Sequence, residues 1–197
     1  MIELFDKSKF KELGEEIYVY KNFIPEDDCK VILKEANALR ENIWTEFAPY
    51  GRSISSLDLK SLIPVQKKME LLIHDNYKIS DKTKIQRIEY GGYANSHTDN
   101  GQFKEVMAAR DKYKEGSPFS LKEYSHYGTV FYFNEFDGGE LFYPNQDIEY
   151  HPNPGDLVIH SSFEIARHGI KKVLSEVRYS YANFISELVR VPFGYFK

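Results

Sequence analysis

Three side chains from the middle of the sequence onward have the types expected of metal ligands: His97, Asp99 and His168. His97 and Asp99 are separated by one residue, so in a strand both side chains point to the same face, with Cα atoms roughly 6.5–7 Å apart. An imidazole and a carboxylate at that distance can bind one metal ion. A His-x-Asp pair alone is weak evidence, because most such pairs lie on a solvated strand edge.

His168, at the start of a predicted strand, adds a second imidazole to the pair. Two imidazoles and one carboxylate form the facial triad of non-haem Fe(II) oxygenases, which leaves coordination positions open. Arg178 and Ser180 share one face of a later predicted strand. A guanidinium beside a hydroxyl is suited to binding the far carboxylate of a dicarboxylate through two parallel hydrogen bonds. The residues therefore indicate a metal site with an anion site beside it.

The first 80 residues are expected to provide a strand and supporting helices. Residues 16–23 alternate as a strand does. Pro25 suits a first helical turn, three acidic residues follow at the positive end of the helix dipole, and apolar residues continue at helical spacing. This pattern predicts a helix over 25–41, and a similar apolar spacing predicts a second helix over 64–76. We expect both helices to support a sheet.

From residue 82 onward the sequence has the pattern of short strands separated by turns. Asp-Gly and Pro-Gly steps between aromatic or β-branched runs are strong hairpin signals. The predicted fold is mainly β with flanking helices (α+β), a sandwich or barrel of which the jelly roll is the common example. The charged segment 100–125 interrupts the strands, and it is either a lid or substrate-contacting insert or a solvated loop. The predicted strands span 84–90, 93–99, 128–134, 140–143, 156–161, 168–173 and 176–187.

Composition excludes several classes of protein. The 197 residues carry a formal charge of -4, which argues against a large nucleic-acid footprint. The one cysteine, Cys29, cannot form an intramolecular disulfide, and we interpret it as a buried structural thiol. There is no apolar run long enough to span a membrane and no secretory signal, so we expect a single cytoplasmic domain over 1–197.

Longer segments resemble those of the Fe(II)/2-oxoglutarate-dependent oxygenases, prolyl 4-hydroxylase-like branch, of the short bacterial or viral type. The pattern His97-x-Asp99 … His168 … Arg178-x-Ser180 matches the family's ordered motifs. Residues 127–145, "YGTVFYFNEFDGGELFYPN", resemble that branch's strand and acidic-Gly-Gly-Glu turn, and residues 151–162, "HPNPGDLVIHSS", resemble the turn and strand before its distal histidine. The likeness extends over about 85–185.

The resemblance implies a fold and a set of site residues. The fold would be a double-stranded β-helix (jelly roll) over 82–190 with N-terminal supporting helices. His97, Asp99 and His168 would bind Fe(II), and Arg178 with Ser180 would bind 2-oxoglutarate. Tyr90 and Thr129 match positions that supply hydroxyls to that co-substrate, with Tyr93 as the alternative to Tyr90.

The resemblance also implies a reaction. 2-Oxoglutarate and O2 would be converted to succinate and CO2 while a C–H bond is hydroxylated, with ascorbate as a supporting factor. The predicted substrate is a prolyl residue of a peptide or protein; the alternatives are a free amino acid or other small metabolite. A zinc hydrolase is the second enzyme hypothesis, but it would not explain Arg178 and Ser180. The hypothesis outside enzymes is a jelly roll that binds a metal or ligand without turnover. His160 is interpreted as a hydrogen-bonded structural histidine, with a contact near the metal or substrate as the alternative.

Overall fold

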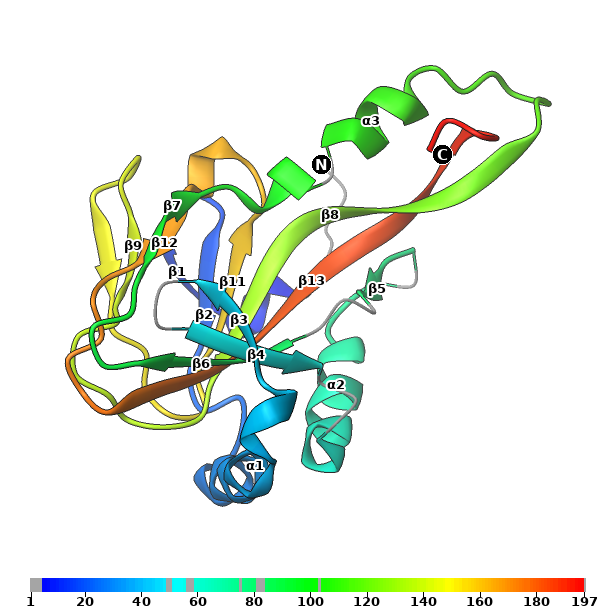
Figure 1. Cartoon of the computed structure of the whole chain (residues 1–197). Helices are drawn as coiled ribbons and strands as arrows, with labels where there is room; N and C mark the ends of the chain where they lie inside the picture. The colour runs from blue at the N-terminus through cyan, green and yellow to red at the C-terminus, as the bar shows by residue number, and fades with distance from the viewer. Residues whose placement is uncertain are drawn as a thin grey trace.

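The chain folds into two β-sheets that face each other, with helices on one outer side (Figure 1). The computed structural model describes residues 5–48, 51–55, 59–74, 76–80, 84–102 and 104–196. Within these ranges one sheet has nine strands and the other has four. The fold is therefore mainly β, as predicted, and it has the jelly-roll architecture.

The larger sheet has the order β1-β2-β11-β8-β13-β6-β4-β3, and β5 pairs with β13 outside this path. Its neighbours are antiparallel, so strands far apart in the sequence lie side by side. The strands are β1 (Lys11–Gly14), β2 (Ile17–Tyr20), β3 (Thr45–Ala48), β4 (Gly51–Ser55), β5 (Lys78–Ile79), β6 (Lys84–Glu89), β8 (Phe119–Tyr132), β11 (Leu157–Ser161) and β13 (Val177–Pro192).

The smaller sheet has the order β10-β9-β12-β7. These strands are short, and they carry two of the three predicted metal ligands. The strands are β7 (Ala94–His97), β9 (Leu141–Tyr143), β10 (Ile148–Tyr150) and β12 (His168–Ile170).

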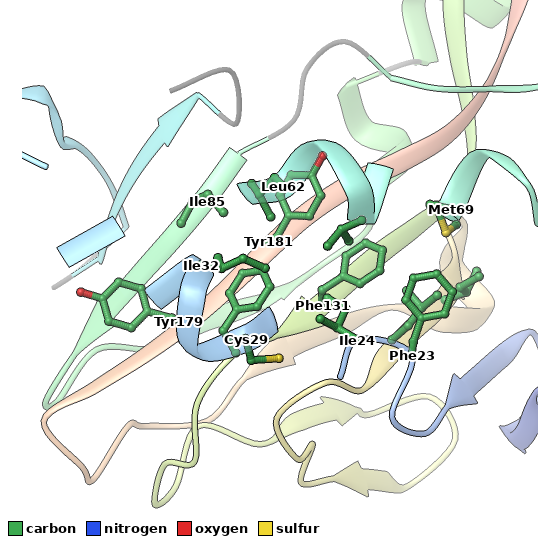
Figure 2. Packing of buried hydrophobic residues seen from close by; sticks show 14 of the residues in the cluster. Phe23, Ile24, Cys29, Ile32, Leu62, Met69, Ile85, Phe131, Tyr179 and Tyr181 are labelled. Carbon is green, nitrogen blue, oxygen red and sulfur yellow. The ribbon is translucent and has the colours of Figure 1, made fainter. Parts of the chain in front are cut away.

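Two helices pack against the outer face of the larger sheet. Helix α1 (Glu26–Ala38) begins after Pro25 with three acidic residues in its first turn, and helix α2 (Ile63–Glu70) follows a 3-10 turn. The predicted helices over 25–41 and 64–76 are therefore present but shorter. On α1, Cys29 and Ile32 are buried against the sheet, where Phe131 and Tyr181 stack (Figure 2). Cys29 is the buried thiol that its helical position predicts.

Alternation along the strands divides the buried residues between the two faces of the larger sheet. On β8, Tyr127 and Phe131 belong to the cluster under the helices, whereas Val130 and Tyr132 pack between the sheets. Successive side chains point to opposite faces, so the even-numbered positions of this part of β8 face the smaller sheet. The space between the sheets holds the candidate site.

The structure corrects the predicted organisation in two places. The first 80 residues contribute strands β1 to β5 as well as helices, and these strands extend the larger sheet at both edges. The segment 100–125 is not an irregular insert: it forms helix α3 (Lys104–Arg110) and the first half of β8. That half of β8 pairs with the end of β13, and the two strands extend from the sheets as an arm with α3 beside it (Figure 1).

Among the residues that the structure describes, no helix is both long and apolar enough to cross a membrane.

Candidate active site

Strand pairing brings the two distant histidines together. His97 on β7 and His168 on β12 are direct cross-strand partners in the smaller sheet, and their ring centroids lie 4.7 Å apart. Asp99 follows β7 and opens a 3-10 turn, so the predicted strand over 93–99 ends earlier, at His97. One ligand atom from each of the three residues lies within 4.8 Å of the others. The structure therefore assembles the predicted triad.

Backbone hydrogen bonds fix both imidazoles with Nε2 directed toward Asp99. Nδ1 of His97 lies 2.8 Å from the carbonyl oxygen of Asn95, and Nδ1 of His168 lies 3.1 Å from that of Ala166. A carbonyl can only accept, so each Nδ1 carries the proton and each Nε2 has a free lone pair. The two Nε2 atoms are 3.8 and 4.0 Å from Asp99 Oδ1.

The protonation states of the buried ligands also suit a metal ion. Burial is the main cause that lowers the pKa of His168 to about 3, so this imidazole is neutral at neutral pH. Burial alone would raise the pKa of Asp99, but the contact with His160 and the neighbouring imidazoles lower it to about 2. A neutral imidazole and an ionised carboxylate are the forms that bind metal.

Arg178 provides a buried cation on the face of the larger sheet that packs toward the smaller sheet. The residue is fully buried on β13, and its Nη1 donates to Ser180 Oγ at 3.1 Å. The guanidinium carbon lies 4.9 Å from the ring centre of Tyr132 and 5.4 Å from that of Phe136. Its Nε and Nη2 are buried without a hydrogen-bond partner among the described residues. A buried charge with unsatisfied donors is costly, so this arrangement fits an anion that accepts from them.

A model of the 2OG-Fe(II) oxygenase superfamily matches residues 83–186, more than half of the chain. The chain belongs to this superfamily. It is a 2-oxoglutarate-dependent dioxygenase, and the chemistry of the family uses Fe(II), 2-oxoglutarate and O2. The donor set of two neutral imidazoles and a carboxylate fits Fe(II), and the unsatisfied donors of Arg178 fit a carboxylate of 2-oxoglutarate.

Solved structures of prolyl hydroxylases share the fold of the oxygenase. A viral collagen prolyl hydroxylase from Paramecium Bursaria Chlorella virus-1, in complex with 2OG, aligns with a TM-score of 0.65 at 16% identity, over 88% of this chain and 97% of the other. A Trichoplax adhaerens prolyl hydroxylase, in complex with a hypoxia inducible factor oxygen degradation domain peptide fragment, aligns with a TM-score of 0.62 at 12% identity, over 87% and 84%. A Pseudomonas putida prolyl-4-hydroxylase aligns with a TM-score of 0.57 at 16% identity, over 88% and 94%. A comparison with curated protein sequences found no match.

The oxygenase does not bring every predicted side chain to the site. Thr129 pairs with Ile159 on β11, and both belong to the face under the helices, opposite to Arg178. Tyr90 lies just after β6 and is 68% exposed, so it faces solvent, and the alternative, Tyr93, is 38% exposed. The structure therefore does not support contacts from Thr129 or Tyr90 to a ligand held by Arg178.

Sequence reasoning missed Tyr132, which lies where a hydroxyl was expected from Thr129. Tyr132 is the direct cross-strand partner of Ser180, and its buried hydroxyl interacts with Arg178 without a well-formed hydrogen bond among the described residues. Burial raises the pKa of this phenol above its usual range, so it remains a neutral donor. Tyr132 could have been identified if it were known which alternate residues of β8 point to the same face as Arg178 and Ser180. That depends on the register between β8 and β13, which the sequence does not reveal.

Proposed function

We propose that His97, Asp99 and His168 bind Fe(II) in this oxygenase and that Arg178 binds the far carboxylate of 2-oxoglutarate. The observation that carries the proposal is a buried guanidinium with two unsatisfied donors on the inner face of the larger sheet, together with two imidazoles on the smaller sheet whose Nε2 atoms are free. Ser180 and the Tyr132 hydroxyl supply further hydrogen bonds to the same carboxylate. The finer proposal is that the hydroxylated substrate is a prolyl residue of a peptide or protein.

The chain's own residues orient the co-substrate and exclude water from it. When bound, Fe(II) supplies the centre at which 2-oxoglutarate and O2 react. Arg178 fixes the far end of 2-oxoglutarate, so that its keto-acid end is directed toward the triad. Tyr132 and Phe136 cover the guanidinium, which strengthens its interaction with a carboxylate because the local dielectric constant is low.

A polypeptide substrate is supported by the open side of the triad. The His97 side chain is 51% exposed, whereas His168 and Asp99 are buried, so the triad is accessible from the side of β7. Phe163 is also partly exposed, and its ring lies 6.2 Å from that of Tyr124. The three solved relatives are named as prolyl hydroxylases, one of them with a bound peptide, which supports the same substrate class.

The first experiment measures succinate formation from 2-oxoglutarate under air, with Fe(II) and with or without ascorbate. The wild-type protein is compared with His168→Ala, which removes one proposed metal ligand. We expect succinate from the wild type only. If the wild type forms no succinate with any substrate and does not bind 2-oxoglutarate, the proposed chemistry is wrong.

The second experiment identifies the substrate class by mass spectrometry. Proline-containing peptides are compared with the same peptides carrying alanine in place of proline, and with free proline. The proposal predicts one added oxygen atom only in the proline-containing peptides, with succinate formation coupled to it. Oxygen added to free proline but not to peptides would support the small-metabolite alternative.

A further inference from the structure

A third histidine, outside the triad, contacts the carboxylate oxygen of Asp99 that the two triad histidines do not approach. His160 on β11 is fully buried, and its Nε2 is 3.4 Å from Asp99 Oδ2. The other carboxylate oxygen, Oδ1, faces the Nε2 atoms of His97 and His168. The two oxygens of Asp99 therefore have different neighbours.

The partners of the two ring nitrogens determine which nitrogen of His160 carries the proton. The Tyr143 hydroxyl is 2.9 Å from His160 Nδ1, and both groups are buried. Burial holds the pKa of Tyr143 well above its usual range, so the phenol keeps its proton. An ionised carboxylate can only accept, so Nε2 must carry the imidazole proton, and Nδ1 then accepts from Tyr143. Tyr143 therefore donates to His160 Nδ1, and the Nε2–H of His160 lies against Asp99 Oδ2 at 3.4 Å, a close contact rather than a formed hydrogen bond.

Two further features fix the position of the His160 ring. Its centroid is 3.9 Å from that of His168, with an angle of 34° between the planes. On the other side, Gly128 is the cross-strand partner of His160, and a Cβ at this position would lie 2.7 Å from His160 Nε2 and 2.4 Å from Asp99 Oδ2. Any side chain at residue 128 would therefore displace one of the two groups.

We propose that His160 and Tyr143 are positioning residues that orient Asp99 for metal binding. By holding Oδ2, His160 leaves Oδ1 as the one oxygen that faces the metal, so the carboxylate binds through a single atom. Coordination positions that a two-oxygen carboxylate would occupy then stay open for the co-substrate. This inference depends on the metal site of the proposed function and adds a role for two residues outside the triad.

The test is Co(II) binding, followed by the visible absorption of the protein-bound ion, without any turnover. Partners that orient metal ligands typically contribute 10–100-fold to metal affinity. We expect His160→Leu to weaken Co(II) binding about 10–100-fold and to alter the Co(II) spectrum, because Asp99 is no longer held. Tyr143→Phe should weaken binding in the same direction but less. His160→Gln, whose amide can donate to Asp99 Oδ2, should recover most of the affinity and the wild-type spectrum.

Tyr179→Phe is the matched control for the tyrosine. Its hydroxyl also makes one side-chain hydrogen bond, 2.7 Å to Asn37 Oδ1, but on the face under the helices. We expect its Co(II) affinity to equal that of the wild type. A purely structural role for His160 would lower the melting temperature but leave the Co(II) affinity and spectrum of the folded variants unchanged.

The outcomes separate this inference from the proposed function. Wild-type Co(II) affinity in folded His160→Leu, or no recovery in His160→Gln, would overturn the positioning role. If His160→Leu does not fold, wild-type affinity and spectrum in Tyr143→Phe would overturn it. Co(II) binding that depends on His160 in a protein that neither forms succinate nor binds 2-oxoglutarate would reject the proposed function and leave this inference intact. Absence of Co(II) binding in the wild type would reject both.

Discussion

At the scale of single residues, the site contains two buried charges with very different surroundings. Asp99 has three imidazoles around it, and their contacts lower the pKa of its carboxyl to about 2 despite burial. Among the described residues, Arg178 makes one well-formed side-chain hydrogen bond, to Ser180, and its Nε and Nη2 atoms make none. The neighbours of Asp99 therefore keep it ionised, the form that binds a metal, whereas the donors of Arg178 are arranged for an anionic ligand.

Replacing Arg178 is expected to weaken 2-oxoglutarate binding specifically. Leaving a buried carboxylate without its charged partner costs about 2–5 kcal/mol, so Arg178→Ala should lower affinity by roughly 30-fold or more. Arg178→Lys keeps the charge but cannot form two parallel hydrogen bonds, so it should give an intermediate loss. Calorimetric titration of 2-oxoglutarate in the presence of Co(II) measures the effect. Arg190→Lys, on the exposed arm, is the control, and equal affinities in all four proteins would contradict the assignment.

At the scale of elements, helix α1 supports the sheet that carries Arg178 and His160. Its inner face packs Ile32, which is 1% exposed, whereas the preceding residue, Val31, is 57% exposed. These neighbours on one helix provide a direct comparison between buried and exposed positions.

Truncation at the two positions should have very different effects on stability. Ile32→Ala is expected to lower the free energy of unfolding by about 2–5 kcal/mol, because it leaves a cavity under the sheet. Val31→Ala should change it by no more than about 0.5 kcal/mol. Urea unfolding of both variants and the wild type checks this. Similar losses in the two variants would mean that α1 does not pack as described.

The turn before β11 depends on a buried carboxylate. Asp156 accepts hydrogen bonds from Lys21 Nζ at 2.8 Å, from the Tyr150 hydroxyl at 2.6 Å and from the Asn153 backbone at 2.9 Å. Burial alone would raise the pKa of Asp156, but the hydrogen bonds from Lys21 and Tyr150 lower it below its usual value. Ionisation of Asp156 is therefore more favourable in the folded than in the unfolded protein.

This lowered pKa predicts how stability changes with pH. The contribution of Asp156 is fully present above its unfolded pKa of about 3.9 and is lost as the pH falls through the lower folded pKa. Asp156→Asn should be less stable than the wild type at pH 7, and the difference should shrink progressively below about pH 4. Chemical unfolding of both proteins across this range measures the difference. A difference that stays constant with pH would contradict the role of the carboxylate.

At the scale of the whole molecule, the triad connects separate parts of the fold. His97 and His168 lie on neighbouring strands of the smaller sheet, and Asp99 lies at the start of the segment that leads through α3 into the arm. A bound metal would link these parts in the folded state only. Metal binding should therefore stabilise the entire protein against unfolding.

The expected stabilisation follows from mass action. A metal ion at about 100 times its Kd adds about 2.7 kcal/mol, which for a chain of this length corresponds to a rise in Tm of about 5–10 °C. Thermal unfolding with Co(II) and with a chelator tests this in the wild type and in His168→Ala. The variant should show little or no rise. An equal rise in both proteins would place the metal elsewhere.

The sequence alone determined the chemistry and the main elements of this protein. Residue types and spacing singled out His97, Asp99, His168, Arg178 and Ser180, because few combinations of side chains suit both a metal and a carboxylate. Helix α1 was predictable because Pro25, the acidic first turn and the apolar spacing are local signals. Hairpin turns likewise marked most of the short strands, since turn chemistry is local in sequence.

Only the tertiary structure decided which neighbours these residues have. A shift of one residue in strand register exchanges the two faces, so the choice of Tyr132 over Thr129 depends on how β8 pairs with β11 and β13. Tyr143 contacts His160, which contacts Asp99, and this series of contacts joins three separate segments and leaves no periodic signal in the sequence. The arm was missed for the same reason, because its strands are stabilised by long-range pairing of 119–125 with the end of β13. Local patterns specify elements, whereas long-range packing specifies the site.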